Sequence, residues 1–332
     1  SEIRYACSKC GVISSEAEWK EHFIDGTFVH EDPDNPVRGF HLNTLASTLT
    51  TWQEVVEKFL TANDQMKKGN VELMKVWTNT EMGQTWEEDG ETIEDDELMK
   101  RREKYKCEVP EEVLYLTAGV DTQDDRFEIE VVGWGPEYES WGIRYAAIYG
   151  DNSDINNQVW QDLDTFLLQT FEKPDGTKMK LSCVCIDSGG HRTNQVYKFC
   201  KARFNRRVFA IKGSNDSAAA YIQKPSKSNR EGAYLFTLGV DTGKSLLMDR
   251  LKLEEEGPGF CHFPKEEGKG YDEKYFKGLT SEKKVMRYKM GRPYFAWELK
   301  DKGEHKRNEA LDCRNYATAA IEIINVPLKK PD

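Results

Sequence analysis

Three strand-like runs lie close together near the middle of the chain, and this closeness limits how they can pair. The runs span residues 113–121, 126–134 and 139–149. Only short turns with Asp or Gly separate them, whereas a parallel pair of strands needs a crossover of about a dozen residues or more. We therefore expect three consecutive antiparallel strands. In the second run, Phe127, Ile129 and Val131 alternate with Glu128 and Glu130, which predicts that one face of this strand lies in water.

After this region the pattern changes to an alternation of helices and strands. It predicts a helix over 157–171, a strand over 181–187, a helix over 194–202, a strand over 207–211 and a last helix over 309–324. The strand over 181–187 is almost wholly apolar, as expected of a strand that is buried on both faces. Three antiparallel strands followed by parallel ones form an α/β mixed sheet flanked by helices. This is the arrangement of ribonuclease H-like folds.

The first part of the chain, residues 1–110, is expected to be a mostly helical segment. Thr51-Trp-Gln-Glu54 has the pattern of a capping box, and an amphipathic helical pattern follows it. Further helices are expected over 73–82 and through 100–105. An acidic stretch at 87–97 precedes Pro110. We place a domain boundary at this proline and expect the α/β domain to cover residues 111–332.

Acidic residues lie at the places where a sheet of this kind binds ligands. Asp121 and Asp187 each close a predicted strand, and Asp312 lies near the start of the last helix. Ligands of open α/β sheets bind beyond the carboxyl ends of the strands, so these acids can converge. Two carboxylates about 4 Å apart repel each other by roughly 4 kcal/mol at an effective dielectric constant near 20. Protonation or a bound cation relieves this repulsion, and we favour the cation.

Oxygen ligands of this kind suit Mg²⁺ or Mn²⁺. Two such ions, roughly 4 Å apart, could activate a water molecule and stabilise the leaving oxygen of a phosphodiester. Glu309 precedes Asp312 by three residues and shares its helical face, so either residue could be the helix-borne ligand. Each acid also has an ordinary interpretation. A strand-end aspartate is often a turn former, and the two helical acids could form surface salt bridges with Arg307 and Arg314.

Three further residues are weaker candidates for contact with a phosphate. Asp187-Ser-Gly-Gly-His191 joins a strand end to a helix start, where free backbone N–H groups could meet a phosphate and His191 could assist proton transfer. Lys212 follows the next strand and could hold a phosphate. Arg307 ends a basic run beside the helical acids. The alternatives are a capping or packed histidine and plain exposed basic residues.

The segment Leu238-Gly-Val-Asp-Thr-Gly-Lys-Ser245 is similar to a P-loop but departs from its consensus. The consensus needs four residues between the first glycine and Gly-Lys, and Gly239 and Gly243 enclose only three. We interpret the segment as a glycine turn between a strand and a helix. The chain contains no better candidate, so no ATPase activity is expected.

Cys7-Ser-Lys-Cys10 has the spacing of half a zinc site. His22 and His30 could complete it, although their spacing departs from that of two-Cys, two-His fingers. A zinc ribbon cut before Ser1 is the more plausible origin, so Zn²⁺ is possible but not favoured here. Four other cysteines lie in predicted strands or helices and are expected to be core side chains of a reduced protein, namely Cys183, Cys185, Cys200 and Cys313.

The formal net charge of −11 argues against an evenly basic nucleic-acid-binding protein. Local basic clusters still permit contact with DNA, because counterion release depends on local lysines and arginines. Such clusters lie at 198–207, 283–292 and 300–307. The sequence has no apolar run of membrane-spanning length and no signal-peptide pattern. It starts without a methionine, which suggests a fragment, and we expect it to be soluble and intracellular.

Several longer motifs resemble a known family. They are Gly39-Phe-His-Leu-Asn43, Thr78-Asn-Thr-Glu-Met-Gly-Gln-Thr-Trp86, Ala118-Gly-Val-Asp-Thr-Gln-Asp-Asp-Arg126, Ile186-Asp-Ser-Gly-Gly190 and Arg307-Asn-Glu-Ala-Leu-Asp-Cys313. In this order they resemble the C-terminal part of the large terminase subunit of lambda-type tailed bacteriophages. The resemblance covers nearly the whole chain.

This resemblance implies the nuclease half of a viral genome-packaging enzyme. Such subunits join an ATPase motor to a ribonuclease H-like endonuclease that cuts concatemeric double-stranded DNA in the host cytoplasm. By the family pattern, Asp121 and Asp187 bind metal, and Glu309 or Asp312 supplies the helix-borne ligand. Residues 1–110 resemble the end of the ATPase part, including a half zinc ribbon. The small terminase subunit and the portal are implied as partners of the full-length protein, and no membrane is implied.

Two other functions stay open on the sequence alone. One is another ribonuclease H-like enzyme, such as a resolvase or an integrase. The other is a non-catalytic module that docks DNA during packaging and keeps only a vestigial site. Metal-dependent nicking of a plasmid would separate the enzymes from the module.

Overall fold

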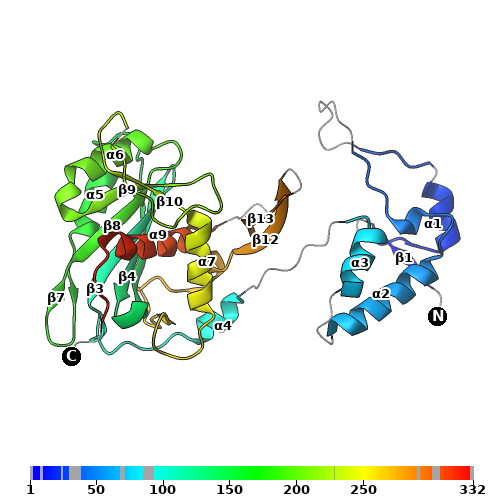
Figure 1. Ribbon diagram of the computed structural model, residues 1–332, viewed down its shortest axis with the longest axis horizontal. Coiled ribbons are helices and arrows are strands. Elements are labelled where there is room, and N and C mark those ends of the chain that lie inside the picture. Colours follow the sequence, from blue (N-terminus) through cyan, green and yellow to red (C-terminus); the bar gives the residue numbers. More distant parts are fainter. Residues whose placement is uncertain are drawn as a thin grey trace. The chain divides into compact units, whose positions relative to one another are not determined.

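The computed structural model of the protein describes residues 3–7, 10–23, 25–29, 39–67, 72–84, 93–227, 229–289, 292–300 and 307–329. The chain divides into two compact units, residues 1–88 and 89–332. Each unit is described by itself. Figure 1 shows their helices and strands in chain order.

The first unit is a small helical structure. It contains β1 (Tyr5–Ala6), β2 (Ile13–Ser14), α1 (Glu16–Phe23), a 3₁₀ helix (Thr44–Ala46), α2 (Trp52–Lys67) and α3 (Glu72–Thr80). The predicted cap of α2 is present, because Glu54 N donates to Thr51 Oγ1 at 3.3 Å. Helix α3 packs on α2 through the rings of Phe59 and Trp77, whose centroids lie 4.9 Å apart. The two helices predicted within residues 1–88 are therefore confirmed.

The second unit is built on a seven-stranded sheet in the order β10-β9-β8-β3-β4-β5-β11. The strands are β3 (Tyr115–Thr122), β4 (Arg126–Trp134), β5 (Ser140–Tyr149), β8 (Leu181–Asp187), β9 (Val208–Gly213), β10 (Leu235–Leu238) and β11 (Cys261–His262). Strands β3, β4 and β5 pair antiparallel, whereas β3, β8, β9 and β10 pair parallel. The predicted α/β mixed sheet of the ribonuclease H-like kind is thus confirmed.

Helices and two hairpins surround this sheet. The helices are α4 (Asp95–Lys100), α5 (Gln158–Leu167), α6 (Thr193–Ala202), α7 (Val240–Leu251), α8 (Glu273–Leu279) and α9 (Glu309–Ile324), with short 3₁₀ turns at Pro136–Tyr138 and Phe204–Arg206. The hairpins are β6–β7 (Phe171–Glu172 and Lys178–Met179) and β12–β13 (Glu282–Lys289 and Arg292–Leu299). The hairpins, β11 and α8 were not predicted from the sequence.

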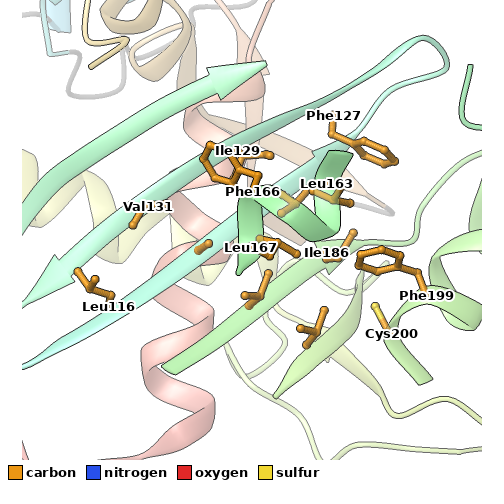
Figure 2. Close-up of a cluster of buried hydrophobic side chains, with 14 of the residues drawn as sticks. Leu116, Phe127, Ile129, Val131, Leu163, Phe166, Leu167, Ile186, Phe199 and Cys200 are labelled. Carbon is orange, nitrogen blue, oxygen red and sulfur yellow. The ribbon is translucent and has the colours of Figure 1, made fainter. Parts of the chain in front are cut away.

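One face of the sheet packs against α5 and α6. Its buried side chains include Leu116 and Ile186 from the strands, Leu163 and Phe166 from α5 and Phe199 from α6 (Figure 2). The apolar face of each helix is turned toward the apolar strand residues, as amphipathic spacing requires. This cluster is the largest apolar core of the second unit.

The opposite face is covered by α9 (Figure 1), and this helix packs closely on β3. A Cβ atom at Gly119 would lie 2.0 Å from Cys313 O and 2.5 Å from Ala317 N. Thr117 Oγ1 donates to Ala317 O at 2.8 Å, which ties the strand to the helix backbone. Glycine on the strand and alanine on the helix therefore allow the two backbones to touch.

The prediction that one face of β4 lies in water is wrong. Glu128 and Glu130 are only 1% and 0% exposed. Glu130 forms an ion pair with Arg314 of α9 at 2.8 Å and accepts hydrogen bonds from two tyrosines of the α8 region. The alternating pattern marks a face covered by helices that bring a compensating charge, because a buried carboxylate is stable only when it is paired.

The second unit also begins before the predicted boundary at Pro110. Leu98 of α4 is buried in a cluster with Leu247 and Phe276. Glu103 N donates to Phe263 O at 3.0 Å. The proline ends a segment that already packs on the α/β unit. The prediction of a helix over 100–105 is wrong, because α4 ends at Lys100 and residues 101–105 are not helical. None of the helices in the described ranges combines the length and the apolar composition that a membrane span requires.

We predict that Gly119→Ala destabilises the second unit by about 3 kcal/mol, because the new Cβ cannot fit against the backbone of α9. Denaturant titration of the free energy of unfolding measures this. Gly39→Ala is the control, since no atom lies within 4 Å of its Cβ position. Equal stability of the two variants would contradict the close approach.

Candidate metal-binding active site

Asp121 and Asp187 lie at the carboxyl ends of two neighbouring parallel strands. Val120 of β3 pairs with Ile186 of β8, so the next residues on the two strands are these aspartates. Side chains alternate along a strand, so Asp121 shares a face with Gly119, which touches α9. Asp187 shares a face with Cys185, which packs on residues of α9. Both carboxylates therefore point to the face that α9 covers.

Asp312 comes to the same face from the first turn of α9. Its carboxylate is held by Lys244, whose Nζ lies 3.1 Å from Oδ1, and by Asn308, whose Nδ2 donates to Oδ2 at 3.0 Å. Asp187 accepts a hydrogen bond from Gly189 N at 3.1 Å, and Asp121 accepts one from the Gln123 amide. Each of the three carboxylates is thus oriented by a neighbour of its own.

Burial and mutual repulsion raise the pKa values of these acids. Burial, and then the charges of Asp312, Asp187 and Glu309, raise the pKa of Asp121 to about 8, against the hydrogen bond from Gln123. Burial and the charges of Glu282 and Asp187 raise the pKa of Asp312 to about 6, although Lys244 lowers it. Burial raises the pKa of Asp187 against the N–H groups of Gly189 and Ser188. The three aspartates therefore share one electrostatic environment.

The three carboxylates share one face, but their oxygen atoms are not all close enough to coordinate one ion together. Within the described part of the chain, one group of three potential ligand side chains brings its atoms to within 4.8 Å of one another, and it is Glu103, Glu256 and His262. The aspartates are not in such a group. A cation at this face would therefore be held by a pair of the carboxylates, or by all three after their side chains move together.

Glu309 has different partners from Asp312. Its Oε1 lies 2.6 Å from Arg126 Nη2, and its Oε2 lies 3.4 Å from Arg307 Nε. The same two arginines also hold Glu128, which accepts a further hydrogen bond from Tyr145. The charge of Glu309 is therefore balanced by arginine, whereas Asp121 and Asp187 have no Lys or Arg ion-pair partner among the described residues.

Lys244 and Glu282 belong to this region but were missed as site residues. Lys244 is 6% exposed, and both Glu282 oxygens lie 2.8 Å from its Nζ. A Cβ atom at Gly243 would lie 2.2 Å from the Tyr221 ring, which shows how tightly α7 is packed here. The P-loop-like segment joins β10 to α7, as predicted, but only Gly239 lies between them, because α7 already begins at Val240. No local sequence signal links Lys244 to Asp312.

The three weaker candidates have different surroundings. His191 is an exposed side chain whose Nδ1 lies 3.1 Å from Asp124 Oδ1. Lys212 is exposed and follows Ile211, which packs on the α9 side, so Lys212 points to the other face of the sheet. Arg307 is half-exposed and paired with Glu128 and Glu309. Of the three, Arg307 directly contacts one of the four predicted acids.

The two N-terminal cysteines lie in the first unit, on the turn between β1 and β2. Gly11 N donates to Cys7 O at 2.9 Å, and Cys10 is exposed. Neither cysteine belongs to a close group of three potential ligands among the described residues. His22 lies in α1, and His30 lies outside the described residues. Zinc binding at Cys7 and Cys10 stays a prediction.

Comparison with known proteins identifies the family. Residues 37–331 match the family model of the terminase large subunit gpA endonuclease domain. The terminase large subunit of Escherichia phage lambda is 36% identical over 330 residues, which cover 97% of this chain and 49% of the relative. The terminase large subunit of Enterobacteria phage P21 is 33% identical over 290 residues, which cover 86% of this chain and 43% of the relative.

The chain therefore spans about half the length of the curated relatives it matches. Among solved structures, a mutant nuclease domain of the large terminase subunit of bacterial virus Sf6 with manganese aligns at a TM-score of 0.43 with 17% identity. This alignment covers 67% of this chain and 96% of the Sf6 chain. Because the family model covers most of its length, the chain belongs to the family of the terminase large subunit gpA endonuclease domain.

Proposed function

We propose that this chain is the metal-dependent DNA endonuclease of a phage packaging terminase and cuts concatemeric duplex DNA by hydrolysis of phosphodiester bonds. The observation that carries the proposal is the convergence of three aspartates, one buried and two partly buried, from β3, β8 and α9 on one face at the end of the sheet. Membership of the gpA endonuclease family supports the same chemistry.

The donor set fits hard divalent cations. Asp121, Asp187 and Asp312 offer only oxygen atoms, which suits Mg²⁺ or Mn²⁺. Their raised pKa values mean that a nearby positive charge would be favourable, because it would relieve the repulsion among the carboxylates. We assign Asp121 and Asp187 to one shared ion and Asp312 to a second. Two bound ions would supply an activated water molecule and stabilise the leaving oxygen.

The other residues of the site position these acids. Lys244 and Asn308 fix the carboxylate of Asp312, and Gln123 fixes that of Asp121. Arg307 is half-exposed, so it can contact a DNA phosphate while it stays paired with Glu309. His191 and Lys212 are exposed basic side chains that we assign to weaker contacts with DNA. Glu309 is assigned to positioning the arginines, and Asp312 to metal.

The partners follow from the packaging role. We propose double-stranded DNA as the substrate, the small terminase subunit and the portal as partners of the full-length protein, and the host cytoplasm as the place of action. The overall acidic charge predicts weak intrinsic affinity for DNA, so recognition of the cut site is assigned to a partner. We expect no ATP hydrolysis by this chain. We also propose that the first unit, residues 1–88, represents the end of the ATPase part.

We predict that the purified chain nicks supercoiled plasmid with Mn²⁺ or Mg²⁺ and not with EDTA. Asp121→Asn and Asp187→Asn should reduce nicking to the EDTA background, because each removes a charge that would hold the shared ion. Agarose-gel conversion of supercoiled to open-circular DNA measures this. Asp249→Asn, on an exposed face of α7, is the control. Wild-type cutting by Asp121→Asn would sink the proposal, and persistent inactivity of the wild type would favour a non-catalytic docking module.

We further predict that Asp312→Asn weakens Mn²⁺ binding by more than roughly tenfold, whereas Glu309→Gln changes it less than that. The reason is that Glu309 is already neutralised by Arg126 and Arg307. Isothermal titration of Mn²⁺ into each variant measures the two dissociation constants. The reverse order would move the helix-borne ligand to Glu309.

A third prediction concerns stability without metal. Folding raises the pKa of Asp121 from 3.8 to about 8. The stability that this carboxyl contributes is therefore fully present below pH 3.8 and is lost as the pH rises through about 8, because the buried group then has to ionise. Asp121→Asn should therefore stabilise the metal-free protein by on the order of several kcal/mol at pH 8 and by little at pH 4. Denaturant titrations in EDTA at both pH values measure this. An equal effect at both would contradict the burial of an ionisable Asp121.

A further inference from the structure

A second cluster of potential metal ligands lies at the β11 edge of the sheet, beyond β4 and β5 from the three aspartates. One ligand atom from each of Glu103, Glu256 and His262 lies within 4.8 Å of the other two. His262 is buried in β11, Glu103 lies on the segment after α4, and Glu256 is an exposed residue of the loop between α7 and β11. Three distant parts of the sequence thus meet at this point.

The histidine ring is oriented by its neighbours. Its Nε2 lies 3.0 Å from Glu139 Oε1, and its Nδ1 lies 2.6 Å from Glu103 Oε1. The ring stacks on Trp141 at 4.8 Å with an interplanar angle of 4°, and the edge of Phe260 packs against it at 4.7 Å. Both ring nitrogens lie at hydrogen-bond distance from a carboxylate, so a cation bound by Nδ1 would replace the proton between Nδ1 and Glu103 and leave Nε2–H on Glu139. A carboxylate behind the histidine is the usual outer partner of a metal-binding imidazole.

The backbone of Glu103 is also fixed in place. Its N–H donates to Phe263 O at 3.0 Å, and Lys265 N donates to its carbonyl oxygen at 2.7 Å. The backbone of Glu103 thus forms a short parallel bridge with Pro264, which holds its carboxylate beside the histidine. Two of the three ligand positions are preorganised, and Glu256 can close the group from the surface.

The local charges do not balance. Three carboxylates, those of Glu103, Glu139 and Glu256, surround one imidazole. In the part of the chain that the structure describes, no Lys or Arg forms an ion pair with any of them. The neighbouring Arg101 donates instead to Leu251 O at 2.7 Å and lies over the Phe260 ring at 4.5 Å. A divalent cation would offset this excess negative charge in a partly buried place.

We propose that Glu103, Glu256 and His262 form a second divalent-metal site, distinct from the nuclease site and suited to Zn²⁺. One imidazole nitrogen with two carboxylate oxygens is a donor set that transition metals accept and Mg²⁺ disfavours. Bound Zn²⁺ would tie the loop after α7 and the segment after α4 to the edge strand β11. Its role is structural, because it clamps the edge of the sheet. The proposal does not depend on the nuclease function.

The test measures Zn²⁺ binding where the other candidate sites are disabled. The full chain carries Asp121→Asn, Cys7→Ser and Cys10→Ser, and Zn²⁺ is titrated by calorimetry and by thermal shift. We expect one bound equivalent and a higher melting temperature, with no comparable shift from Mg²⁺. Glu256→Gln and Glu103→Gln should each weaken Zn²⁺ binding at least roughly tenfold. Absence of a Zn²⁺-dependent shift in the parent would overturn the proposal.

Glu255→Gln is the matched control, because Glu255 is an exposed neighbour of Glu256 on the same loop. It should bind Zn²⁺ like the parent. His262→Gln is a supporting variant, but its burial makes loss of the fold a competing cause, so the exposed Glu256→Gln decides. Equal Zn²⁺ affinity of Glu256→Gln and Glu255→Gln would place any bound ion elsewhere and refute the site.

Discussion

The contact between α9 and β3 is the constraint on which the active-site geometry depends. Gly119 leaves room for the backbone of Cys313 and Ala317, and Thr117 bonds to the helix carbonyl. This close packing brings the first turn of α9, and with it Asp312, to the same face as Asp121 and Asp187. A bulkier strand residue would push the helix, and its carboxylate, away from the strand ends.

The same interface contains several buried charges, and most of them are paired. Glu130 is matched by Arg314, Glu128 and Glu309 by Arg126 and Arg307, and Glu282 and Asp312 by Lys244. Buried charges cost free energy unless they are compensated, so these pairs are needed for the helix to pack at all. Asp121 and Asp187 are the exceptions within the described residues. This uncompensated negative charge is what distinguishes the proposed metal site from the structural ion pairs around it.

The sequence predicted much of the sheet. Strands β4 and β8 and helix α9 have the predicted bounds, because each shows a strong periodic pattern or an almost wholly apolar run. The face of β4 was misjudged for a physical reason. Alternating Glu residues indicate a solvated face only when nothing covers it, and the covering residue Arg314 lies far away in the sequence. The domain boundary was misplaced because Pro110 marks a break in the backbone pattern, while the burial of Leu98 depends on long-range packing.

By itself, the sequence determined which acids close the strands, which helix follows them, and that three early strands must pair antiparallel. These are consequences of local periodicity and of short connections, and they need no knowledge of distant residues. Only the tertiary structure decided that Lys244 holds Asp312, that arginines neutralise Glu309, and that His262 meets Glu103 and Glu256. Such contacts join residues far apart in the chain. They arise when packing brings the elements together, so no local pattern encodes them.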